Sequence, residues 1–440
     1  MSSIVVRGCS WLLLSMVLVP SVRAGADDES WASKKIILTR DGIRIGQGDG
    51  KGVVLYTADL SEIVYRVIRE QDGWLLVRER GVEGWLSKDS AVLLKNAVPY
   101  FSDRLRANNR DALAYAHRGC AWREKGEMDF ALKDFDEAIR LASETDERFV
   151  PVRPIVGRIF GGGPQMQMQV PQHPSWFRQR GLLYDEKGEY DKAIRDFSEA
   201  IHLNPQDPHS YVERGITFKR KKEFDKAIAD HSEAIRLDSK WANAYFNRAN
   251  VYKARKDYDC AISDFSEAIR LDPQDPDAFF NRANIYKAWK DYDRAISDFS
   301  EAIRLDPQDP DAFFNRDNIY RGKKDYVKAA ADLCEVIRLD PKDPDAHEAL
   351  AWLLATCPDS KVRDGEKAVQ CAGTACELTD GKSAYCLATL AAAFAEVGKF
   401  DLAVKWQQRA LESTKYDKDE GSQARLRLQL FHDRKPYRED

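Results

Sequence analysis

The sequence is short of the residue patterns that form catalytic and metal sites. It has seven histidines, none in a cluster with metal-ligand spacing, and no motif typical of a catalytic nucleophile. None of its eight cysteines is separated from the next by two residues, the spacing found in zinc-binding pairs. We therefore expect no catalytic residue, no metal site and no cofactor, and we interpret the chain as non-enzymatic.

An excess of one charge sign is also lacking. Lysine and arginine number 68 against 72 aspartates and glutamates, so the net charge is only −4 although 32% of residues are charged. General nucleic-acid binding needs a clear basic excess, because the ligand is a dense row of phosphates. This balance argues against a nucleic-acid partner and indicates solvated helix faces.

Long apolar runs are missing except near the N-terminus. Arg7 precedes an apolar run at residues 11–19, and Ala24 ends a segment with the small residues of a cleavage site. This order is typical of a secretory signal peptide at residues 1–24, and the run is too short to span a bilayer comfortably. We expect an exported protein, periplasmic, envelope-associated or secreted, with no membrane span after cleavage. An uncleaved N-terminal anchor is the rival interpretation.

What the sequence has in quantity is a repeat, nearly identical in three copies that begin at residues 242, 276 and 310. The copy at residues 276–309 starts with Pro276, which suits a first helical position, and continues with apolar residues at helical spacing. A turn at Lys290 separates this stretch from a second apolar stripe, which ends before Pro307. The repeat therefore predicts a helix–turn–helix unit.

Small and bulky residues alternate along each copy, and a proline closes it. In residues 276–309 the small residues are Ala283, Ala295 and Ala302, and the bulky ones are Tyr286 and Phe299. This pattern resembles the tetratricopeptide repeat family. The resemblance implies a mainly α fold, an α-solenoid in which helical hairpins form a right-handed superhelix, and a function in binding protein or peptide partners.

Two copies depart from this pattern, and two charged positions recur in nearly all of them. His231 stands where other copies have phenylalanine or leucine, and Asp317 stands where they have a small residue, so we expect local loosening at both. An arginine recurs in each first helix and an aspartate in each second helix. Arg282 and Asp298 lie about equally far from their turn, which predicts a structural ion pair within each unit.

Residues 34–95 change period from helical to β-type. Short β-type runs alternate with glycine and aspartate, which predicts a small antiparallel barrel. Trp74, Gly84 and Trp85 make residues 72–94 resemble the end of a bacterial SH3-like domain. That resemblance implies binding of peptides or cell-wall material, and the alternative is a barrel whose tryptophans are core and which only caps the solenoid. The glycines around Lys51 are flanked by β-type runs, so we expect a hairpin turn there rather than a phosphate loop.

The chain divides into seven segments on these patterns. Between two repeats lies a stretch, residues 146–173, that is too apolar for simple disorder. It either folds over the solenoid as a lid or packs against its own two units. The segments are a signal peptide (1–24), an SH3-like barrel (34–95), a half repeat and first unit (97–145), an insertion (146–173), five units (174–343), two divergent units (344–414), and a capping helix with a polar tail (415–440).

The candidate binding residues are asparagines in register. One row recurs once in each of the three similar copies, and a second row follows three positions later on the same helix face. Amides can donate and accept hydrogen bonds along an extended peptide backbone, as some tetratricopeptide proteins do, and in-register phenylalanines can offer apolar pockets. The alternative is that recent duplication copied the rows without any ligand. The candidates are Asn247, Asn250, Asn281, Asn284, Asn315, Asn318, Phe280 and Phe314.

These observations favour an exported scaffold or adaptor that holds an extended peptide or partner segment in the concave groove of the solenoid. One alternative is an envelope-binding module, in which the SH3-like domain holds a cell-wall component. A second alternative is an enzyme with its site in the insertion. Seven cysteines remain after signal cleavage, and one disulfide among the four at 357, 371, 376 and 386 is a possibility. The patterns leave the oligomeric state open.

Overall fold

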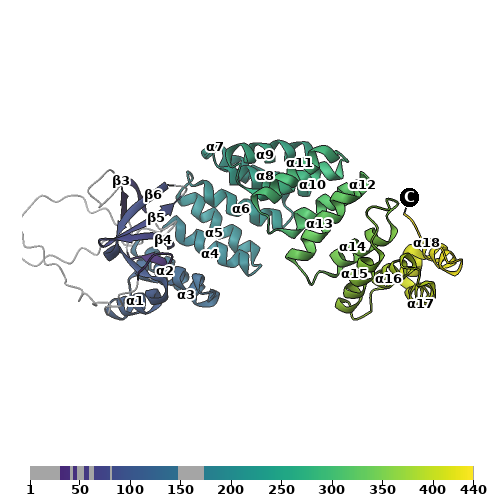
Figure 1. Cartoon of the computed structure of the whole chain (residues 1–440). Helices are drawn as coiled ribbons and strands as arrows, with labels where there is room; N and C mark the ends of the chain where they lie inside the picture. The colour runs from purple at the N-terminus through teal and green to yellow at the C-terminus, as the bar shows by residue number, and fades with distance from the viewer. Residues whose placement is uncertain are drawn as a thin grey trace, which may run out of the picture. The chain divides into compact units, whose positions relative to one another are not determined.

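The computed structural model describes residues 30–39, 43–46, 54–58, 64–79, 82–146 and 173–439 (Figure 1). The predicted signal peptide, the glycine-rich turn around Lys51 and the insertion between residues 146 and 173 lie outside the described residues. So does the site of the enzyme alternative. The chain forms two compact parts, Met1–Leu183 and Tyr184–Asp440, and each is described by itself.

The first part begins with an antiparallel β-sheet of seven short strands. Their order is β3-β2-β6-β5-β4-β1-β7, and the described residues show no pairing between the outer strands β3 and β7. The predicted β region is thus confirmed, but as an open sheet rather than a closed barrel. The outer strand β7 has only three residues before the chain enters a helix. The strands are β1 (Lys35–Leu38), β2 (Ile43–Gly46), β3 (Val54–Ala58), β4 (Val64–Gln71), β5 (Trp74–Glu79), β6 (Val82–Ser87) and β7 (Ala91–Leu93), with a short helix η1 (Lys88–Ser90) before β7.

The hairpin of β4 and β5 shows why these residues form strands. Asp72 and Gly73 have φ angles of 48° and 80°, the left-handed pair that a two-residue hairpin turn requires. Along β4, Tyr65 and Val67 are buried, while Arg66 between them is exposed. One face of the sheet therefore supplies the core.

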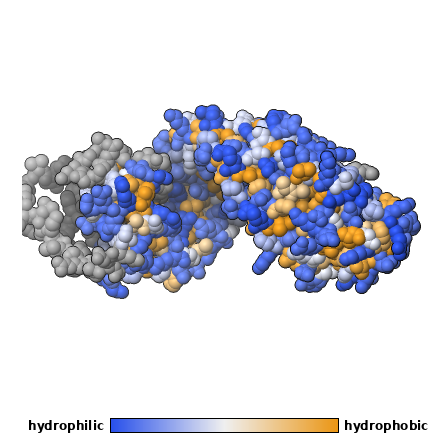
Figure 2. Space-filling view, viewed as in Figure 1, coloured by the Kyte–Doolittle hydropathy of each residue, from blue (hydrophilic) through white to orange (hydrophobic). Residues whose placement is uncertain are grey.

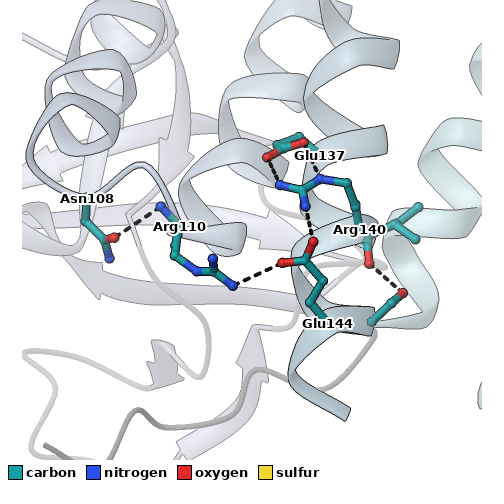
Figure 3. A network of polar contacts seen from close by, with 7 residues as sticks. Asn108, Arg110, Glu137, Arg140 and Glu144 are labelled. Carbon is teal, nitrogen blue, oxygen red and sulfur yellow. Dashed lines mark hydrogen bonds and ion pairs between the residues drawn. The ribbon is translucent and has the colours of Figure 1, made fainter. Parts of the chain in front are cut away.

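The chain passes directly from β7 into helix α1 (Leu94–Ala107), which buries Ala97, Phe101 and Leu105. They lie in the stretch that the sequence predicts to begin with a half repeat. Helices α2 (Ala112–Glu124) and α3 (Met128–Asp146) form the next hairpin, and α4 (Pro174–Glu186) follows the undescribed segment. A surface network ties the α1–α2 loop to α3 (Figure 3). Arg110 donates to Glu144 at 3.0 Å, and Arg140 pairs with both Glu137 and Glu144.

The second part consists of helices, which pack as consecutive antiparallel hairpins. Within a hairpin the two helices pack against each other, and first helices of successive units also make contact, as α6 does with α8, α10 with α12, and α14 with α16. The predicted mainly α solenoid is confirmed. The helices are α5 (Tyr190–Leu203), α6 (Pro208–Arg220), α7 (Phe224–Leu237), α8 (Ala242–Arg255), α9 (Tyr258–Leu271), α10 (Pro276–Ala288), α11 (Tyr292–Leu305), α12 (Pro310–Gly322), α13 (Tyr326–Leu339), α14 (Pro344–Thr356), α15 (Gly365–Leu378), α16 (Ala384–Glu396), α17 (Phe400–Leu411) and α18 (Thr414–His432).

The repeat unit of α10 and α11 shows how the sequence sets the hairpin. The Asp275 carboxylate accepts a hydrogen bond from the backbone N–H of Asp277 at 3.0 Å, which caps α10, and Pro276 occupies its first turn. Lys290 turns the chain with a φ of 61°. Ala283 and Ala295 are fully buried, so the two helices can approach closely.

The surface is mainly polar. On the face shown in Figure 2, hydrophilic side chains predominate and apolar patches lie among them. Among the described residues no helix combines the length and apolar character needed to cross a membrane.

Candidate functional site

The predicted ion pairs between first and second helices are confirmed. Arg282 donates from Nε and Nη2 to the two carboxylate oxygens of Asp298 at 2.8 and 2.9 Å, and Asp298 is buried. This two-pronged geometry fits the planar guanidinium and orients it firmly. The same arrangement joins Arg118 to Asp134, Arg214 to Asp230, Arg248 to Asp264 and Arg316 to Asp332.

Each of these arginines also reaches the preceding repeat unit through a serine. Arg282 donates from Nη1 to Ser266 Oγ at 2.8 Å, and the Ser266 hydroxyl donates to the carbonyl of Ile262 at 2.6 Å. These serines escaped prediction from the sequence, although they recur at a fixed distance before the arginines. The bridge fixes each first helix against its neighbour. The other serines are Ser102, Ser198, Ser232 and Ser300.

The same position carries aspartate beside the undescribed insertion. Arg180 donates to Asp136 Oδ1 at 2.7 Å, and Asp136 takes the place that serine holds in the other units. Burial raises the pKa of the Asp134 and Asp230 carboxyls, and hydrogen bonds from Arg118 and Arg214 oppose that shift. These charges belong to the scaffold and are not free to bind a ligand.

The two asparagine rows lie on α8, α10 and α12, and each amide is partly tied to its own helix. Asn281 Nδ2 donates to the Asp277 carbonyl at 2.8 Å, and Asn284 Nδ2 donates to the Phe280 carbonyl at 3.0 Å. An amide has two N–H groups, so one remains for a ligand at Asn281 and Asn284, whereas Asn247 Nδ2 also donates to Asn243 Oδ1 at 2.8 Å. The equivalent bonds of Asn247, Asn250, Asn315 and Asn318 run to the carbonyls four residues earlier, at 2.9, 3.1, 2.8 and 2.8 Å.

A column of lysines, which the sequence patterns did not single out, runs beside the first asparagine row. Lys219, Lys253 and Lys287 hold the same position in three successive units and are half-buried. Lys253 Nζ donates to Asn281 Oδ1, and Lys287 Nζ donates to Asn315 Oδ1, so these two lysines each reach an amide of the next unit. Burial lowers the pKa of all three ammonium groups.

These three lysines have no carboxylate partner among the described residues. Their charges also affect one another, because Lys219 contributes to the lowered pKa of Lys253. The column ends at α12, where Arg321 takes the lysine position and pairs with Asp317 at 3.1 Å. Partly desolvated cations without counter-charges, next to amides with a free N–H, form a surface suited to carboxylates along an extended chain.

The phenylalanines at the candidate positions contribute to the core of their units. Phe280 meets Phe299 edge-on with ring centroids 5.6 Å apart. Phe314 packs partly buried against two apolar clusters.

The two departures from the repeat pattern are buried polar side chains. His231 is fully buried, and neither ring nitrogen has a hydrogen-bond partner. Burial lowers its pKa to about 3. Asp317 is also fully buried, and burial raises the pKa of its carboxyl to about 6. Both are costly substitutions in a core that elsewhere holds phenylalanine and alanine.

The sheet carries the residues of the envelope-binding alternative. Trp74 and Trp85 are half-buried, and the Arg69 guanidinium lies 5.4 Å from the centre of the Trp85 ring. A cavity of about 410 Å³ lies on β4 and β5, where the β4–β5 register shifts at Ile68. Its lining residues are Ser33, Arg66, Val67, Ile68 and Arg78.

The cysteines and acidic residues form no further site among the described residues. The seven cysteines outside the predicted signal peptide are free thiols. No group of three or more His, Cys, Asp and Glu side chains in the described ranges could hold a metal ion.

Fold and site together define a protein built from stacked helical hairpins with a ladder of bridging arginines. A family model described as tetratricopeptide repeat matches residues 175–207 and 276–309, and a second, described as TPR repeat, matches residues 249–289. The matched residues therefore carry tetratricopeptide repeats, and the described helices on either side of them form a solenoid of similar hairpins. The resemblance of the β region to SH3-like domains stays a prediction.

Several solved structures are similar to parts of this chain. The C-terminal part of a TPR repeat-containing protein from Cytophaga hutchinsonii is 19% identical, with 58% of this chain and 96% of that chain covered and a TM-score of 0.45. Pseudomonas aeruginosa pilF is 18% identical, with 48% and 93% covered and a TM-score of 0.41. YrrB, described as a TPR protein with an unusual peptide-binding site, is 24% identical, with 43% and 95% covered and a TM-score of 0.37. No curated protein sequence matches the chain.

Proposed function

We propose that this protein is an exported, non-enzymatic adaptor that binds an extended, acidic segment of a partner protein along the first helices of its repeats. The observation that carries the proposal is the column of Lys219, Lys253 and Lys287 beside the first asparagine row. The lysines lack carboxylate partners among the described residues, and each of the last two contacts an asparagine of the next unit. Export rests on the composition of residues 1–24.

The chemistry of the surface sets what it would recognise. Free amide N–H groups would donate to backbone carbonyls of the partner segment. Every residue has such a carbonyl, so this contact does not depend on the partner's side chains. The lysines add a preference for carboxylates, and their partial burial weakens screening by solvent. The partner segment would therefore be extended and rich in aspartate or glutamate.

A pull-down from envelope extract tests this function. The mature protein is compared with a variant in which Asn247, Asn281 and Asn315 are all alanine. A matched control replaces Ser263 and Ser297, which are exposed on the second helices, by alanine. The proposal expects specific protein partners that the asparagine variant loses and the serine variant keeps. Equal recovery by all three proteins would contradict it.

A second candidate function is attachment to the cell envelope through the sheet. The cavity on β4 and β5 favours it, because Arg66 lines it together with the exposed Ile68, while Arg78 at its edge pairs with Glu83. Such a site would suit an anionic wall component. Cosedimentation with purified wall material separates the candidates, because replacing Arg66 by glutamine would release the protein from the wall and leave partner capture by the repeats unchanged.

A further inference from the structure

The last described residues of the chain lie against helix α14. Helix α18 ends at His432, and Arg434, with a φ of 55°, turns the chain so that residues 435–439 continue without helical structure. The backbone N–H of Glu439 donates to the carbonyl of Thr356 at 2.9 Å. Its carboxylate accepts from Trp352 Nε1 at 3.0 Å. The tail thus satisfies a carbonyl at the end of α14 that has no partner within the helix.

Each of the last three described side chains meets a matching group. The ring of Tyr437 lies 5.9 Å from that of Trp352. Arg438 pairs with Glu396, at the end of α16, with 2.6 Å between Nη2 and Oε2. A second nitrogen of Arg438 donates to the Ala355 carbonyl at 3.3 Å. An aromatic ring, a cation and an anion are therefore each recognised separately.

The position of Trp352 relates this contact to the candidate site. Trp352 follows Asn318 at the same spacing at which Asn318 follows Asn284, so it occupies on α14 the place that the second asparagine row holds on α8, α10 and α12. The tail consequently lies on the helix face along which a partner segment is proposed to lie in the preceding units. Glu396 supplies a negative charge here, where the preceding units supply lysines.

We infer that α14 and the end of α16 form a peptide-binding site for an aromatic–basic–acidic segment, filled in this chain by its own Tyr437, Arg438 and Glu439. The inference rests on the proposed function, because it extends the binding face of the repeats to their C-terminal end. Pro436, Tyr437 and Arg438 are only half-buried and have no helical structure, and segments of this kind open locally more readily than packed helices. A free segment of the same chemistry then takes the place of the tail.

Peptide binding to a shortened chain tests the inference. The variant ends at Lys435, which keeps the backbone hydrogen bonds of Arg434 and Lys435 that close α18. The probe is a labelled peptide with the sequence of residues 434–439, followed by fluorescence anisotropy. The shortened chain is expected to bind it saturably and at least about tenfold more tightly than the full chain, because the attached tail competes at high effective concentration. A peptide with glutamate in place of Arg438 is expected not to bind.

A second variant guards against a folding defect in the shortened chain. The full-length chain with Y437A and R438A keeps every residue of the solenoid and is expected to bind the probe as the shortened chain does. If neither variant binds more peptide than the unaltered chain, or if the glutamate peptide binds equally well, the site does not exist. The variant with alanine at Asn247, Asn281 and Asn315 would leave tail-peptide binding unchanged. The outcome of this test is therefore independent of the outcome of the pull-down.

Discussion

Arg282 and Asp298 form a two-pronged ion pair between the helices of one repeat, with N–O distances of 2.8 and 2.9 Å. The guanidinium keeps a third nitrogen for Ser266 of the preceding repeat. One arginine therefore closes its own hairpin and joins it to the preceding one. Because this bridge recurs along the solenoid, the first helices that carry the asparagines and lysines are held in fixed register.

Replacing Asp298 by alanine is expected to destabilise the solenoid by about 3 kcal/mol, because the Arg282 guanidinium stays partly buried without its counter-charge. Urea unfolding followed by circular dichroism measures the change. S297A, an exposed neighbour on the same helix, serves as the control and is expected to change stability by less than about 0.5 kcal/mol. Equal midpoints for D298A and the unaltered chain would show that the pair is dispensable.

Replacing Ser266 by alanine is expected to weaken the junction between two repeats by about 1 kcal/mol, since Arg282 loses one hydrogen-bond acceptor. The loss should be local, so amide hydrogen exchange in α9 and α10 is the suitable measurement. Exchange should rise in these helices while α14 to α17 remain unchanged. The exposed Ser263 on the same helix provides the matched alanine control. A uniform rise along the whole chain would argue against a junction role.

Replacing His231 by phenylalanine is expected to stabilise α6 and α7, since the buried ring nitrogens have no partners. The gain should depend on pH. The folded pKa of about 3 lies below the ordinary 6.5, because of burial and then the charges of Lys219 and Arg248. The unfolded chain therefore binds the extra proton, and His231 costs stability as the pH falls from about 6.5 toward 3.

Thermal unfolding of H231F and the unaltered chain between pH 7 and 4 measures this dependence. The slope difference can reach about 1.4 kcal/mol per pH unit, the free energy equivalent to one pKa unit. Room for phenylalanine exists, because Gly119 and Phe135 already form the same glycine–phenylalanine contact in the first complete repeat. A stability difference that does not change with pH would contradict the buried neutral histidine.

Replacing Asp317 by alanine is expected to change folding stability with the opposite dependence on pH. Its folded pKa of about 6 lies above the ordinary 3.8, chiefly because of burial, with Arg321 opposing the shift. The folded state favours the protonated carboxyl, so Asp317 costs stability as the pH rises from about 4 through 6. D317A should therefore gain roughly 1–3 kcal/mol at neutral pH and lose that advantage below pH 4. Urea midpoints at pH 4 and 7 are the measurement, and a larger gain at pH 4 would contradict the assignment.

The hairpins and the pairing of Arg282 with Asp298 could be predicted because both follow from the period of the repeat. The bridge to Ser266 could not be predicted, because it depends on which residue of a second helix lies beside the arginine of the next unit. The way in which two units stack determines that contact. The lysine column was missed for the same reason, since a solvated lysine and one directed at the next unit's asparagine look alike in a single copy.

Other features depend on contacts between segments that share no pattern. The sequence gives no sign that Trp352 contacts residues 435–439. Those residues have no periodicity that would predict where they pack. The strand order of the sheet depends on pairings between distant strands, which a propensity pattern does not resolve. His231 and Asp317 were predictable as weak points, since each breaks a repeat whose core is otherwise apolar.

The measurement that bears most directly on the central claim is the affinity of the mature chain for a labelled peptide of alternating glutamate and alanine. The variant replaces Lys219, Lys253 and Lys287 by glutamine, and the matched control replaces Lys222, Lys256 and Lys290 by asparagine. The control lysines have the same spacing but sit at exposed turns with φ angles of 61°, 69° and 61°, which asparagine tolerates. The account predicts saturable binding that weakens with added salt, is lost in the glutamine variant and is kept in the control. Equal affinity for all three chains, or equal binding of a glutamine–alanine peptide, would contradict it.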